Sequence, residues 1–263
     1  MTSQEERGIV VILPAYNEED NIPNLLQRWH QQEETLLKKG LRLKVLVVND
    51  GSRDGTISLL PEMSQKYSFL RYVSHDGNQG LGQALTTGIH YVLEKEASSA
   101  YVVVMDCDNT HDPSYAISLI DKMEGTPHKD VVIASRYQAG SKTSGVPLYR
   151  WVLSYGARGI YAALLSVPGV RDYTCGYRIY RTSLLRKAVQ YYGDVFLEEK
   201  GFGCMVELLY KLYLRGATFD EIAFHLRYDD KLGISKMKVM NTTLQSIAMV
   251  FRLRKIRRGN SNE

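Results

Sequence analysis

Two aspartates directly follow an apolar, largely β-branched run of the sequence. The run is Val-Val-Val-Met at residues 102–105, and the carboxylates are Asp106 and Asp108. Such a run predicts a buried strand, and open α/β sheets bind ligands beyond the carboxyl ends of their strands. Carboxylate oxygens suit Mg²⁺ or Mn²⁺, which commonly bridge protein carboxylates to a phosphate-bearing substrate. The pair therefore indicates a metal beside a diphosphate, with a capped turn and a solvated carboxylate as the structural alternative.

The length and composition of the chain restrict the class of protein. Its 263 residues suit one large α/β domain, or such a domain with a short extension. The formal net charge of +4 is too small to imply general nucleic-acid binding. Because the amino terminus lacks the features of a signal peptide, we expect a cytoplasmic protein. Cys107, Cys175 and Cys204 are far apart and are expected to be reduced thiols.

Strand-like and helix-like segments alternate as far as residue 140. Strands are expected at residues 8–13, 44–48, 71–74, 101–105 and 130–135, with helices starting near residue 21 and at 56–67, 80–94 and 113–123. This alternation predicts an α/β fold with a mostly parallel central sheet and helices on both faces. The polar loops that end the strands then lie along one edge of the sheet.

The pattern weakens in the second half of the chain. Residues 141–147 are polar and contain glycine, which predicts a mobile loop. Helices are expected at 148–166, 182–190 and 203–214, and short strands at 176–180 and 218–224. The first of these helices is about long enough to span a bilayer at roughly 20 residues. Because Arg150 and Arg158 interrupt it, we expect it to lie on the protein or on a membrane surface.

Three strand ends present polar residues on the same edge of the predicted sheet, at residues 14–18, 48–52 and 106–108. Their convergence strengthens the interpretation of the aspartate pair as a ligand site. Asp50 is a candidate acceptor for a base or a ribose hydroxyl, and Glu18 is another. Gly80 and Gly82 are expected to allow close packing at a helix start, because a lone Gly-x-Gly is weak evidence for phosphate binding.

The motifs at these strand ends resemble those of a known family. Pro-Ala-Tyr-Asn-Glu, Val-Asn-Asp-Gly-Ser-x-Asp-Gly-Thr, Asn-x-Gly-x-Gly-x-Ala and Asp-x-Asp occur in this order. Together they resemble the inverting, family 2 nucleotide-sugar glycosyltransferases of the GT-A class. In the second half, Ala-Ser-Arg-Tyr, Gly-Tyr-Arg-Ile-Tyr-Arg and Gly-Ile-Ser-Lys-Met narrow the resemblance to polyprenol- and dolichol-phosphate mannosyltransferases. The resemblance covers roughly residues 8–240.

This resemblance implies a role for individual residues. The nucleotide sugar would be bound by Pro14, Tyr16, Glu18, Val48, Asp50, Asp106, Cys107, Asp108, Arg178 and Lys236. The acceptor phosphate would be bound by Arg136, Arg150 and Ser154, and the metal by Asp108 with Thr110 as an uncertain second ligand. The catalytic set would be Asp106, Asp108, Arg136 and Lys236.

Two positions depart from the family pattern. Thr110 stands where the family has a glutamine that binds the metal, and His111 and Asp112 are close enough in sequence to replace it. Asp230 stands six residues before Lys236, where the mannosyltransferases have an arginine. The first change leaves the metal ligands open, and the second leaves the choice of sugar nucleotide open.

The residue types agree with this chemistry on independent grounds. A lipid monophosphate is already an anionic nucleophile, so its attack on the sugar needs orientation more than a general base. Arginines hold phosphate oxygens in a bidentate geometry and would supply that orientation. The leaving nucleoside diphosphate gains charge as the sugar bond breaks, and a metal and Lys236 would stabilise it. One direct displacement inverts the sugar carbon.

The resemblance thus implies a metal-dependent polyprenyl-phosphate hexosyltransferase, using Mg²⁺ or Mn²⁺ and favouring mannose from GDP-mannose. One alternative is the same fold with UDP-glucose or another sugar nucleotide. Another is a non-catalytic subunit that binds a nucleotide sugar. Glu207 lies on an apolar helix and could be a buried polar group, a sugar ligand or an exposed side chain. His30, His75, His90, His128 and His225 show no spacing typical of metal ligation or catalysis.

The carboxyl terminus predicts contact with a membrane surface. Residues 1–240 are expected to form a single GT-A domain, and residues 241–263 an amphipathic, basic tail. Residues 252–258 hold five cations, which anionic lipid would attract at about 1 kcal/mol for each basic residue near the surface. A solvated terminus is the alternative. Peripheral attachment at the cytoplasmic face, or a separate membrane subunit, would bring the enzyme to its lipid acceptor.

Overall fold

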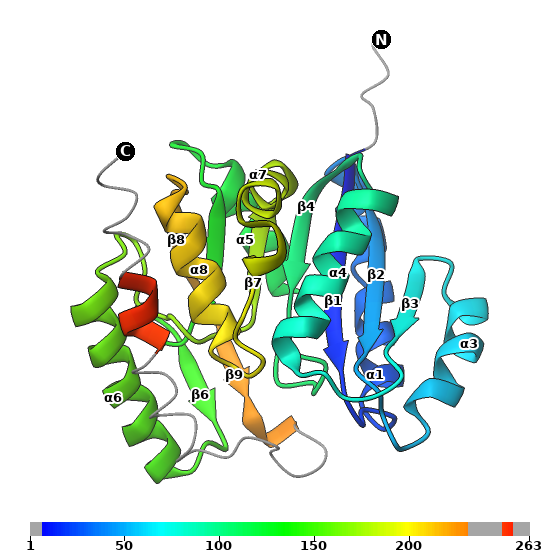
Figure 1. Cartoon of the computed structure of the whole chain (residues 1–263). Helices are drawn as coiled ribbons and strands as arrows, with labels where there is room; N and C mark the ends of the chain where they lie inside the picture. The colour runs from blue at the N-terminus through cyan, green and yellow to red at the C-terminus, as the bar shows by residue number, and fades with distance from the viewer. Residues whose placement is uncertain (1–6, 231–248, 255–263) are drawn as a thin grey trace.

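A seven-stranded sheet separates two layers of helices (Figure 1). The computed structural model describes residues 7–230 and 249–254, with the side chains of 148–153 and 230 left out. The strands of this sheet are β1 (Arg7–Ala15), β2 (Leu41–Asn49), β3 (Leu70–Ser74), β4 (Ser99–Val104), β5 (Val131–Ser135), β7 (Arg178–Arg181) and β8 (Phe219–Ala223). The α/β fold predicted from the alternating pattern is confirmed.

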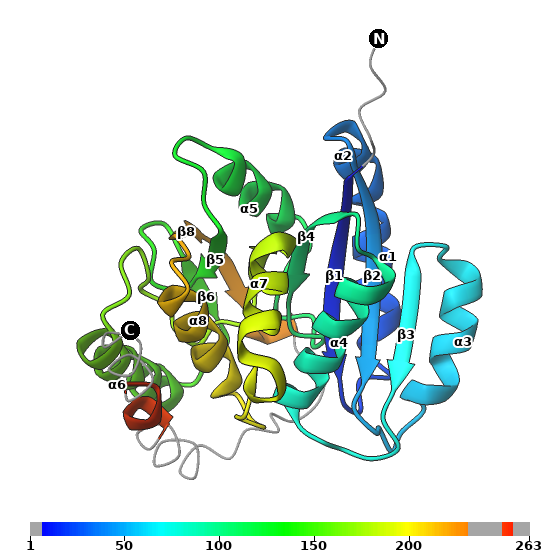
Figure 2. The ribbon, with the colours of Figure 1, turned by 45° about the horizontal axis from the view of Figure 1, so that its top comes forward.

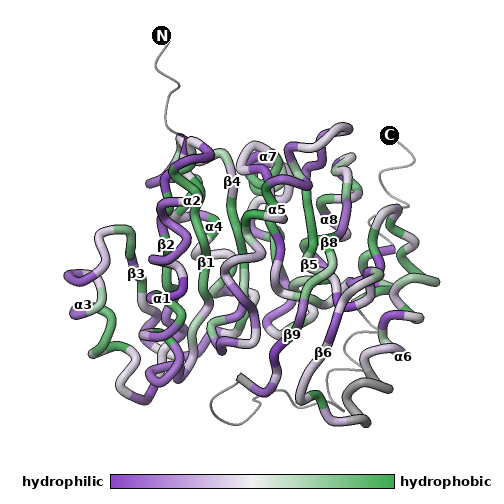
Figure 3. The backbone as a smooth tube through the Cα atoms, turned by 180° about the vertical axis from the view of Figure 1, so that it is seen from behind, coloured by the Kyte–Doolittle hydropathy of each residue, from purple (hydrophilic) through white to green (hydrophobic). Residues whose placement is uncertain are grey.

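Helices cover both faces of the sheet (Figure 3). They are α1 (Ile22–His30), α2 (Glu33–Lys38), α3 (Thr56–Lys66), α4 (Leu81–Lys95), α5 (Tyr115–Glu124), α6 (Leu148–Leu165), α7 (Thr182–Tyr192) and α8 (Cys204–Leu214). Helices α4, α7 and α8 lie on the near face in Figure 1, and α1, α2 and α5 lie on the far face. The central strands are buried between these layers, as their apolar, β-branched sequences require.

The sheet has the strand order β3-β2-β1-β4-β7-β5-β8. All neighbouring strands are parallel except β7, which runs antiparallel to both β4 and β5. Pro14 of β1 pairs with Val48 of β2, and Ile12 pairs with Val104 of β4. This register ends β1, β2 and β4 at nearly the same level, at the lower edge of the sheet in Figure 1. The loops that carry the predicted nucleotide and metal residues therefore start side by side.

The region predicted as a mobile loop contains a strand. Within residues 141–147, β6 (Lys142–Ser144) pairs in parallel with β9 (His225–Arg227) to form a separate two-stranded sheet. The prediction failed because the residues are polar and their partner is about 80 positions away in the chain. Short 3₁₀ turns, η1 (Gly193–Val195) and η2 (Tyr228–Asp230), complete the described elements.

The helix predicted at residues 148–166 is α6, which lies at one side of the molecule (Figures 1 and 2). Tyr161 and Leu165 are buried against the body, while Tyr155 and Ile160 are exposed. Over the described ranges, no helix combines the length and the apolar character that crossing a membrane requires. The prediction that α6 does not span a bilayer is consistent with this finding.

Part of the predicted tail packs against the body. Residues 249–254 are helical and lie beside α6 in both views (Figures 1 and 2). Met249, Val250 and Leu253 are buried, so this apolar side is not available to a membrane. Arg252 donates to Glu199 at 2.9 Å. Residues 249–254, which the sequence assigned to the tail after residue 240, are therefore packed against the domain. Residues 241–248 and 255–263 lie outside the described residues.

Glu207 of α8 is a buried polar group. The sequence had also allowed a sugar ligand or an exposed side chain at this position. Its side chain is fully buried, and Oε1 accepts from Nζ of Lys211, also fully buried, at 2.8 Å. Oε2 accepts from the backbone N–H groups of Glu198 and Glu199 at 3.0 and 2.8 Å. Arg252 also lies 3.4 Å from Oε1. Glu207 therefore joins α8, the loop before it and residues 249–254.

We expect Glu207→Ala to lower the free energy of unfolding by about 3–5 kcal/mol, because the change removes the buried carboxylate that lies 2.8 Å from the buried Lys211 ammonium. Chemical denaturation followed by circular dichroism would measure the loss. The double variant Glu207→Leu with Lys211→Met should recover much of it, since two apolar side chains replace both charges. A loss below about 1 kcal/mol for the single variant would contradict this account of the pair.

Candidate active site

The loops after β1 and β2 are held together by hydrogen bonds. The backbone N–H of Asn17 donates to Oγ of Ser52 at 2.9 Å, and Oδ1 of Asn17 accepts from the N–H of Arg53 at 2.8 Å. The N–H of Glu18 donates to Oγ1 of Thr56 at 2.9 Å. The loops after β1 and β2 thus form one hydrogen-bonded unit, called the double loop below. Four residues predicted to bind the nucleotide lie on or beside it: Pro14, Tyr16, Glu18 and Val48.

Asp50 supports the start of α4. Its carboxylate is almost fully buried and accepts from the backbone N–H groups of Gln79 and Gly80 at 2.9 and 2.8 Å. Nδ1 of His75 lies 2.8 Å from the same carboxylate, and Nε2 of His75 lies 3.0 Å from Oγ1 of Thr87. Sequence reasoning gave His75 no role, because its partners follow from the pairing of β2 with β3. Asp50 positions this corner of the site.

Gly82 allows a close approach at the helix start, as predicted. Its N–H donates to the carbonyl oxygen of Lys200 at 3.0 Å. A Cβ atom at this position would lie 1.9 Å from the carbonyl oxygen of Glu199. Gly80 has a φ of +95°, and a Cβ there would lie 2.5 Å from the Lys200 oxygen. Both glycines therefore serve packing against the loop before α8.

Asp106 follows β4 and lies against the second half of the chain. A Cβ atom at Gly176 would lie 2.7 Å from Oδ1 of Asp106, so any other residue there would displace this carboxylate from its present position. The N–H of Asp106 donates to Nδ1 of His111 at 3.3 Å. Cys107 is buried beside it. The position of the Asp106 carboxylate thus depends on a glycine about 70 positions later in the chain.

Asp108 is oriented by Thr110. Oδ1 of Asp108 accepts from the hydroxyl of Thr110 at 2.6 Å and from its N–H at 3.2 Å. Thr110 is 3% exposed, and its carbonyl oxygen accepts from the N–H of Arg227 at 3.1 Å. The residue at the family's glutamine position therefore contacts the aspartate that is predicted to bind the metal.

The two alternatives to Thr110 have other partners. The ring of His111 is buried and stacks on Tyr177 with the centroids 5.3 Å apart. Asp112 accepts from the N–H of Ser114 at 2.8 Å at the start of α5, and pairs with Arg28 at 2.9 Å. Burial opposes ionisation of Asp112, but the Ser114 hydrogen bonds and the Arg28 charge outweigh it and lower its pKa. Both side chains serve the local fold.

The donor set after β4 fits a magnesium-like ion bound together with a substrate. Within residues 7–230 and 249–254, no three His, Cys, Asp or Glu side chains gather in a group that could hold a metal. Mg²⁺ is usually bound by one or two carboxylates, with substrate phosphates and water completing its shell. Asp106 and Asp108 supply carboxylates of that kind at a strand end, so the residues present suit the predicted cofactor.

Arg136 is clamped at the end of β5. Its Nε and Nη2 donate to the two carboxylate oxygens of Asp172 at 2.8 and 2.7 Å, and Nη2 also donates to Oγ1 of Thr174 at 2.6 Å. Asp172 is fully buried. Although burial opposes its ionisation, the Arg136 guanidinium holds the pKa of Asp172 below its usual value. The arginine is therefore fixed and charged.

Residues around this arginine connect the two halves of the site. Thr174 contacts Arg136, and Gly176, two positions later, lies against Asp106. The hydroxyls of Tyr137 and Ser154 are 2.5 Å apart, which joins α6 to the residue after Arg136. The predicted acceptor residues Arg136 and Ser154 are thereby brought together. The side chain of Arg150 and the whole of Lys236 lie outside the described residues.

The prediction that Arg178 contacts the diphosphate is not supported by its position. The guanidinium is fully buried, and Nε, Nη1 and Nη2 donate to the carbonyl oxygens of Cys175, Met205 and Tyr173 at 2.8, 2.8 and 2.7 Å. Because the guanidinium is fully buried, it offers no exposed surface to a diphosphate. Arg178 instead holds the backbone on either side of Thr174, and so supports the connection between Arg136 and Asp106.

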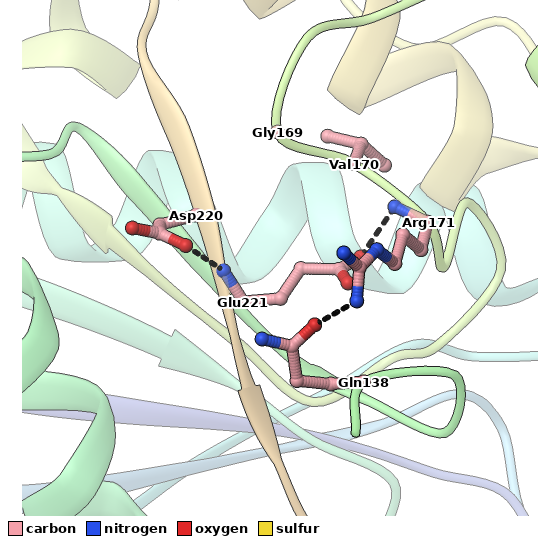
Figure 4. Close-up of a pocket in the computed structure, with 6 residues that line it drawn as sticks. All are labelled: Gln138, Gly169, Val170, Arg171, Asp220 and Glu221. Atoms are coloured by element: carbon pink, nitrogen blue, oxygen red, sulfur yellow. Dashed lines mark hydrogen bonds between the residues drawn. The ribbon is translucent and has the colours of Figure 1, made fainter.

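A cavity of about 300 Å³ is lined in part by residues 169–171, which directly precede Asp172 in the chain (Figure 4). Its lining includes Gln138, Arg171 and Glu221, and Figure 4 shows Arg171 reaching both of the other side chains. Oε1 of Glu221 accepts from the N–H groups of Arg171 and Asp172 at 2.6 and 2.7 Å. Burial raises the pKa of Glu221. Glu221 therefore holds the loop that carries Asp172, and none of the residues that line the cavity is a predicted site residue.

We expect Thr110→Val to raise the half-saturating concentration of Mn²⁺ by roughly 2- to 10-fold, because the hydrogen bond that orients Asp108 is lost and a typical hydrogen bond contributes about 0.5–1.5 kcal/mol. Titration of the metal in a binding or transfer assay would measure it. Thr110→Ser keeps the hydroxyl and should stay within about 2-fold of the wild-type protein. Equal metal responses of the valine and serine variants would contradict an orienting role for the hydroxyl.

Comparisons with known proteins agree with this geometry. A polyprenol monophosphomannose synthase from Mycolicibacterium smegmatis is 32% identical over 242 residues, which cover 91% of this chain and 84% of the relative. A dolichol-phosphate mannosyltransferase from Pyrococcus furiosus is 30% identical over 250 residues. That match covers 94% of this chain but only 64% of the archaeal protein.

The structural comparison agrees on the fold. Glucosyl-3-phosphoglycerate synthase from Mycobacterium tuberculosis, solved with Mn²⁺, UDP and phosphoglyceric acid, matches with a TM-score of 0.64. The two chains are 22% identical, and the match covers 94% of this chain and 78% of that one. The family described as glycosyl transferase family 2 matches residues 10–189, which is more than half of the sequence. The chain belongs to glycosyl transferase family 2.

Proposed function

We propose that the protein transfers mannose from GDP-mannose, with inversion, to a polyprenyl phosphate. The observation that carries the proposal is the short connection from Arg136 through residues 174–176 to Asp106. It joins a fixed cation, suited to an acceptor phosphate, to carboxylates suited to a metal-bound diphosphate. The two curated relatives, whose names join mannose to polyprenol and dolichol phosphates, support the choice of donor sugar and acceptor.

Arg136 would position the attacking phosphate. Two of its guanidinium nitrogens are held by Asp172 and Thr174, whereas Nη1 has no hydrogen-bond partner within the described part of the chain. A fixed guanidinium with one remaining edge can orient a phosphate oxygen at little entropic cost. Ser154, held by Tyr137, would supply a hydroxyl beside it, and Arg150 of α6 a second cation.

Asp106 and Asp108 would hold Mg²⁺ or Mn²⁺ against the diphosphate of the donor. When bound, such an ion supplies positive charge to the leaving nucleoside diphosphate. Thr110 would orient Asp108, and Gly176 would leave room for Asp106. The double loop with Pro14, Tyr16, Glu18 and Val48 would bind the nucleoside, with Asp50 as its support. Lys236 stays a predicted contact to the leaving group.

A second donor remains a specific alternative. Asp230, at the end of η2, stands where the related mannosyltransferases have an arginine. Reversal of a charge near the sugar nucleotide would favour a donor other than GDP-mannose, such as UDP-glucose. A non-catalytic subunit that only binds a nucleotide sugar would keep the fold but form no glycolipid. One assay distinguishes both alternatives from the main proposal.

The assay incubates the purified protein with a short polyprenyl phosphate, Mn²⁺ or Mg²⁺, and separately GDP-mannose, UDP-glucose and other sugar nucleotides. Mass spectrometry of the lipid should detect a hexosyl polyprenyl phosphate with GDP-mannose. Asp108→Ala should lower the rate by at least about 100-fold, because the metal that would stabilise the charge on the leaving diphosphate loses a ligand. Asp194→Ala, which removes an exposed aspartate from η1, is the matched control.

The outcomes distinguish the alternatives. Product from UDP-glucose alone would replace mannose by another sugar, and absence of any glycolipid would favour the binding subunit or a different acceptor. Full activity of a folded Asp108→Ala variant would exclude the metal assignment, and circular dichroism would establish the fold.

We also propose that the protein attaches peripherally to anionic membrane, on the side of α6 and residues 249–254. Phe251 is exposed beside α6, while Arg252 is used for docking to the body. The remaining cations of the basic run are Arg254, Lys255, Arg257 and Arg258. They would be attracted to anionic lipid, and attachment through a separate membrane subunit is the alternative.

Replacement of these four cations by alanine should reduce sedimentation with vesicles that contain phosphatidylglycerol, because each basic residue contributes about 1 kcal/mol near an anionic surface. Arg252 is kept, so that residues 249–254 stay docked. Binding of wild-type protein should weaken at high salt and be low on neutral phosphatidylcholine vesicles. Equal sedimentation of wild-type and variant protein would show that the basic run is not the attachment site.

A further inference from the structure

Asn109 lies between the predicted metal ligand Asp108 and Thr110, which orients it. Its φ is +63°, in the left-handed region where asparagine is one of the few tolerated residues besides glycine. The residue is 2% exposed. A buried side chain in a rare backbone conformation must be held by its surroundings, so its contacts determine the shape of this loop.

The amide of Asn109 bonds to the segment that follows β1. Nδ2 donates to Oδ1 of Asn21 at 2.9 Å and to the carbonyl oxygen of Asn21 at 3.3 Å. Oδ1 of Asn109 accepts from Nδ2 of Asn24 at 3.3 Å. Both the donor and the acceptor side of one amide are thus used on the start of α1.

The same contacts continue to Glu18. Nδ2 of Asn21 donates to Oε2 of Glu18 at 2.7 Å, and Asn21 is 3% exposed. The carbonyl oxygen of Glu18 also accepts from the N–H of Asn21 at 3.0 Å. The side chains of Asn109 and Asn21 therefore form a hydrogen-bonded chain. It connects the loop after β4 with Glu18 of the predicted nucleoside loop.

We propose that Asn109 is a positioning residue that couples the nucleoside loop to the metal-binding carboxylates, so that nucleotide and metal bind as a pair. A nucleoside at Glu18 favours the arrangement of Asn21 that holds Asn109, and this arrangement fixes Asp108 toward the metal. Because such coupling is reciprocal, the metal strengthens nucleoside binding by the same factor. The inference rests on the proposed function, which places nucleotide and metal at these loops.

A linking role explains features that a simple turn does not require. A turn at φ +63° is formed equally well by glycine, without a buried amide. The buried amide must be hydrogen-bonded on both sides or it costs stability, which restricts the loop to one arrangement. Asn17, also at positive φ, lies on the nucleoside loop, so two asparagines in this conformation shape the facing loops.

The test compares Asn109→Gly, which keeps the backbone conformation and removes the amide, with the wild-type protein. Isothermal titration of GDP and of UDP, each with and without Mn²⁺, gives the factor by which the metal tightens nucleotide binding. This factor should fall by roughly 2- to 10-fold in Asn109→Gly, the effect of the lost hydrogen bonds. Ser166→Gly is the matched control, since Ser166 has a φ of +50° at the exposed end of α6.

A double-mutant cycle identifies the route. Asn21→Ala should reduce the same factor, and its combination with Asn109→Gly should add little, because both changes break one connection. An unchanged metal factor in Asn109→Gly, or additive effects of the two variants, would overturn the inference. A variant that is merely less stable would show a lower melting temperature with an unchanged factor, which also counts against coupling.

Failure of the proposed function gives a different result. If wild-type protein binds GDP or UDP with the metal but makes no glycolipid, the transfer reaction is excluded and the coupling is still measured. If wild-type protein binds neither nucleotide, the nucleotide site itself is wrong, and the inference falls with it.

Discussion

Parallel pairing of β1 with β2 and β4 is the constraint on which the rest of this structure depends. The register ends three strands at nearly one level, so that residues from three separate stretches of sequence meet at one edge. A shift of β4 by one residue would turn Asp106 and Asp108 to the other face, because side chains alternate along a strand. The apolar faces of these strands are buried between two helix layers, which makes such a shift costly.

The second half of the chain holds these strand ends in position through buried polar groups. Arg178 uses three nitrogens on backbone carbonyls, and Glu207 uses one carboxylate oxygen on the loop before α8 and the other on Lys211 of α8 itself. Buried charges of this kind contribute little to net stability, but they fix the backbone around them because they lose heavily when a partner moves. Arg178 in particular holds the backbone around Thr174, which connects Arg136 with Asp106.

The sequence predicted most of the parallel sheet, because strands buried on both faces carry continuous apolar runs. It predicted β7 as a strand but not its antiparallel pairing with β4 and β5, because the sequence of a four-residue strand does not indicate its direction in the sheet. β6 and β9 were missed because both are short and polar.

The candidate site, like the sheet, was predicted from the sequence only in part. The sequence placed Asp106 and Asp108 at a strand end and predicted close packing at Gly82, and the structure agrees on both points. The metal and substrate roles of these residues stay predictions, and positions that depend on tertiary contacts were missed or misassigned. Arg178 was placed at the diphosphate although it is buried, and His75 was given no role although it meets Asp50. His75 and Asp50 are 25 residues apart, and Arg178 and Met205 are 27 apart, so local sequence patterns do not indicate these contacts.

The carboxylate of Asp50 lies at the start of α4 and affects how the charge of a bound diphosphate can be compensated. In many α/β proteins the positive end of a helix dipole faces the substrate phosphates. Here two N–H groups before α4 are already occupied by Asp50, and the carbonyl oxygen of Lys200 takes the N–H of Gly82. The Asp50 carboxylate thus already compensates the positive end of this helix, so a diphosphate bound nearby would gain little electrostatic stabilisation from it. Compensation of its negative charge then rests on cations that arrive with the substrate or from elsewhere in the chain.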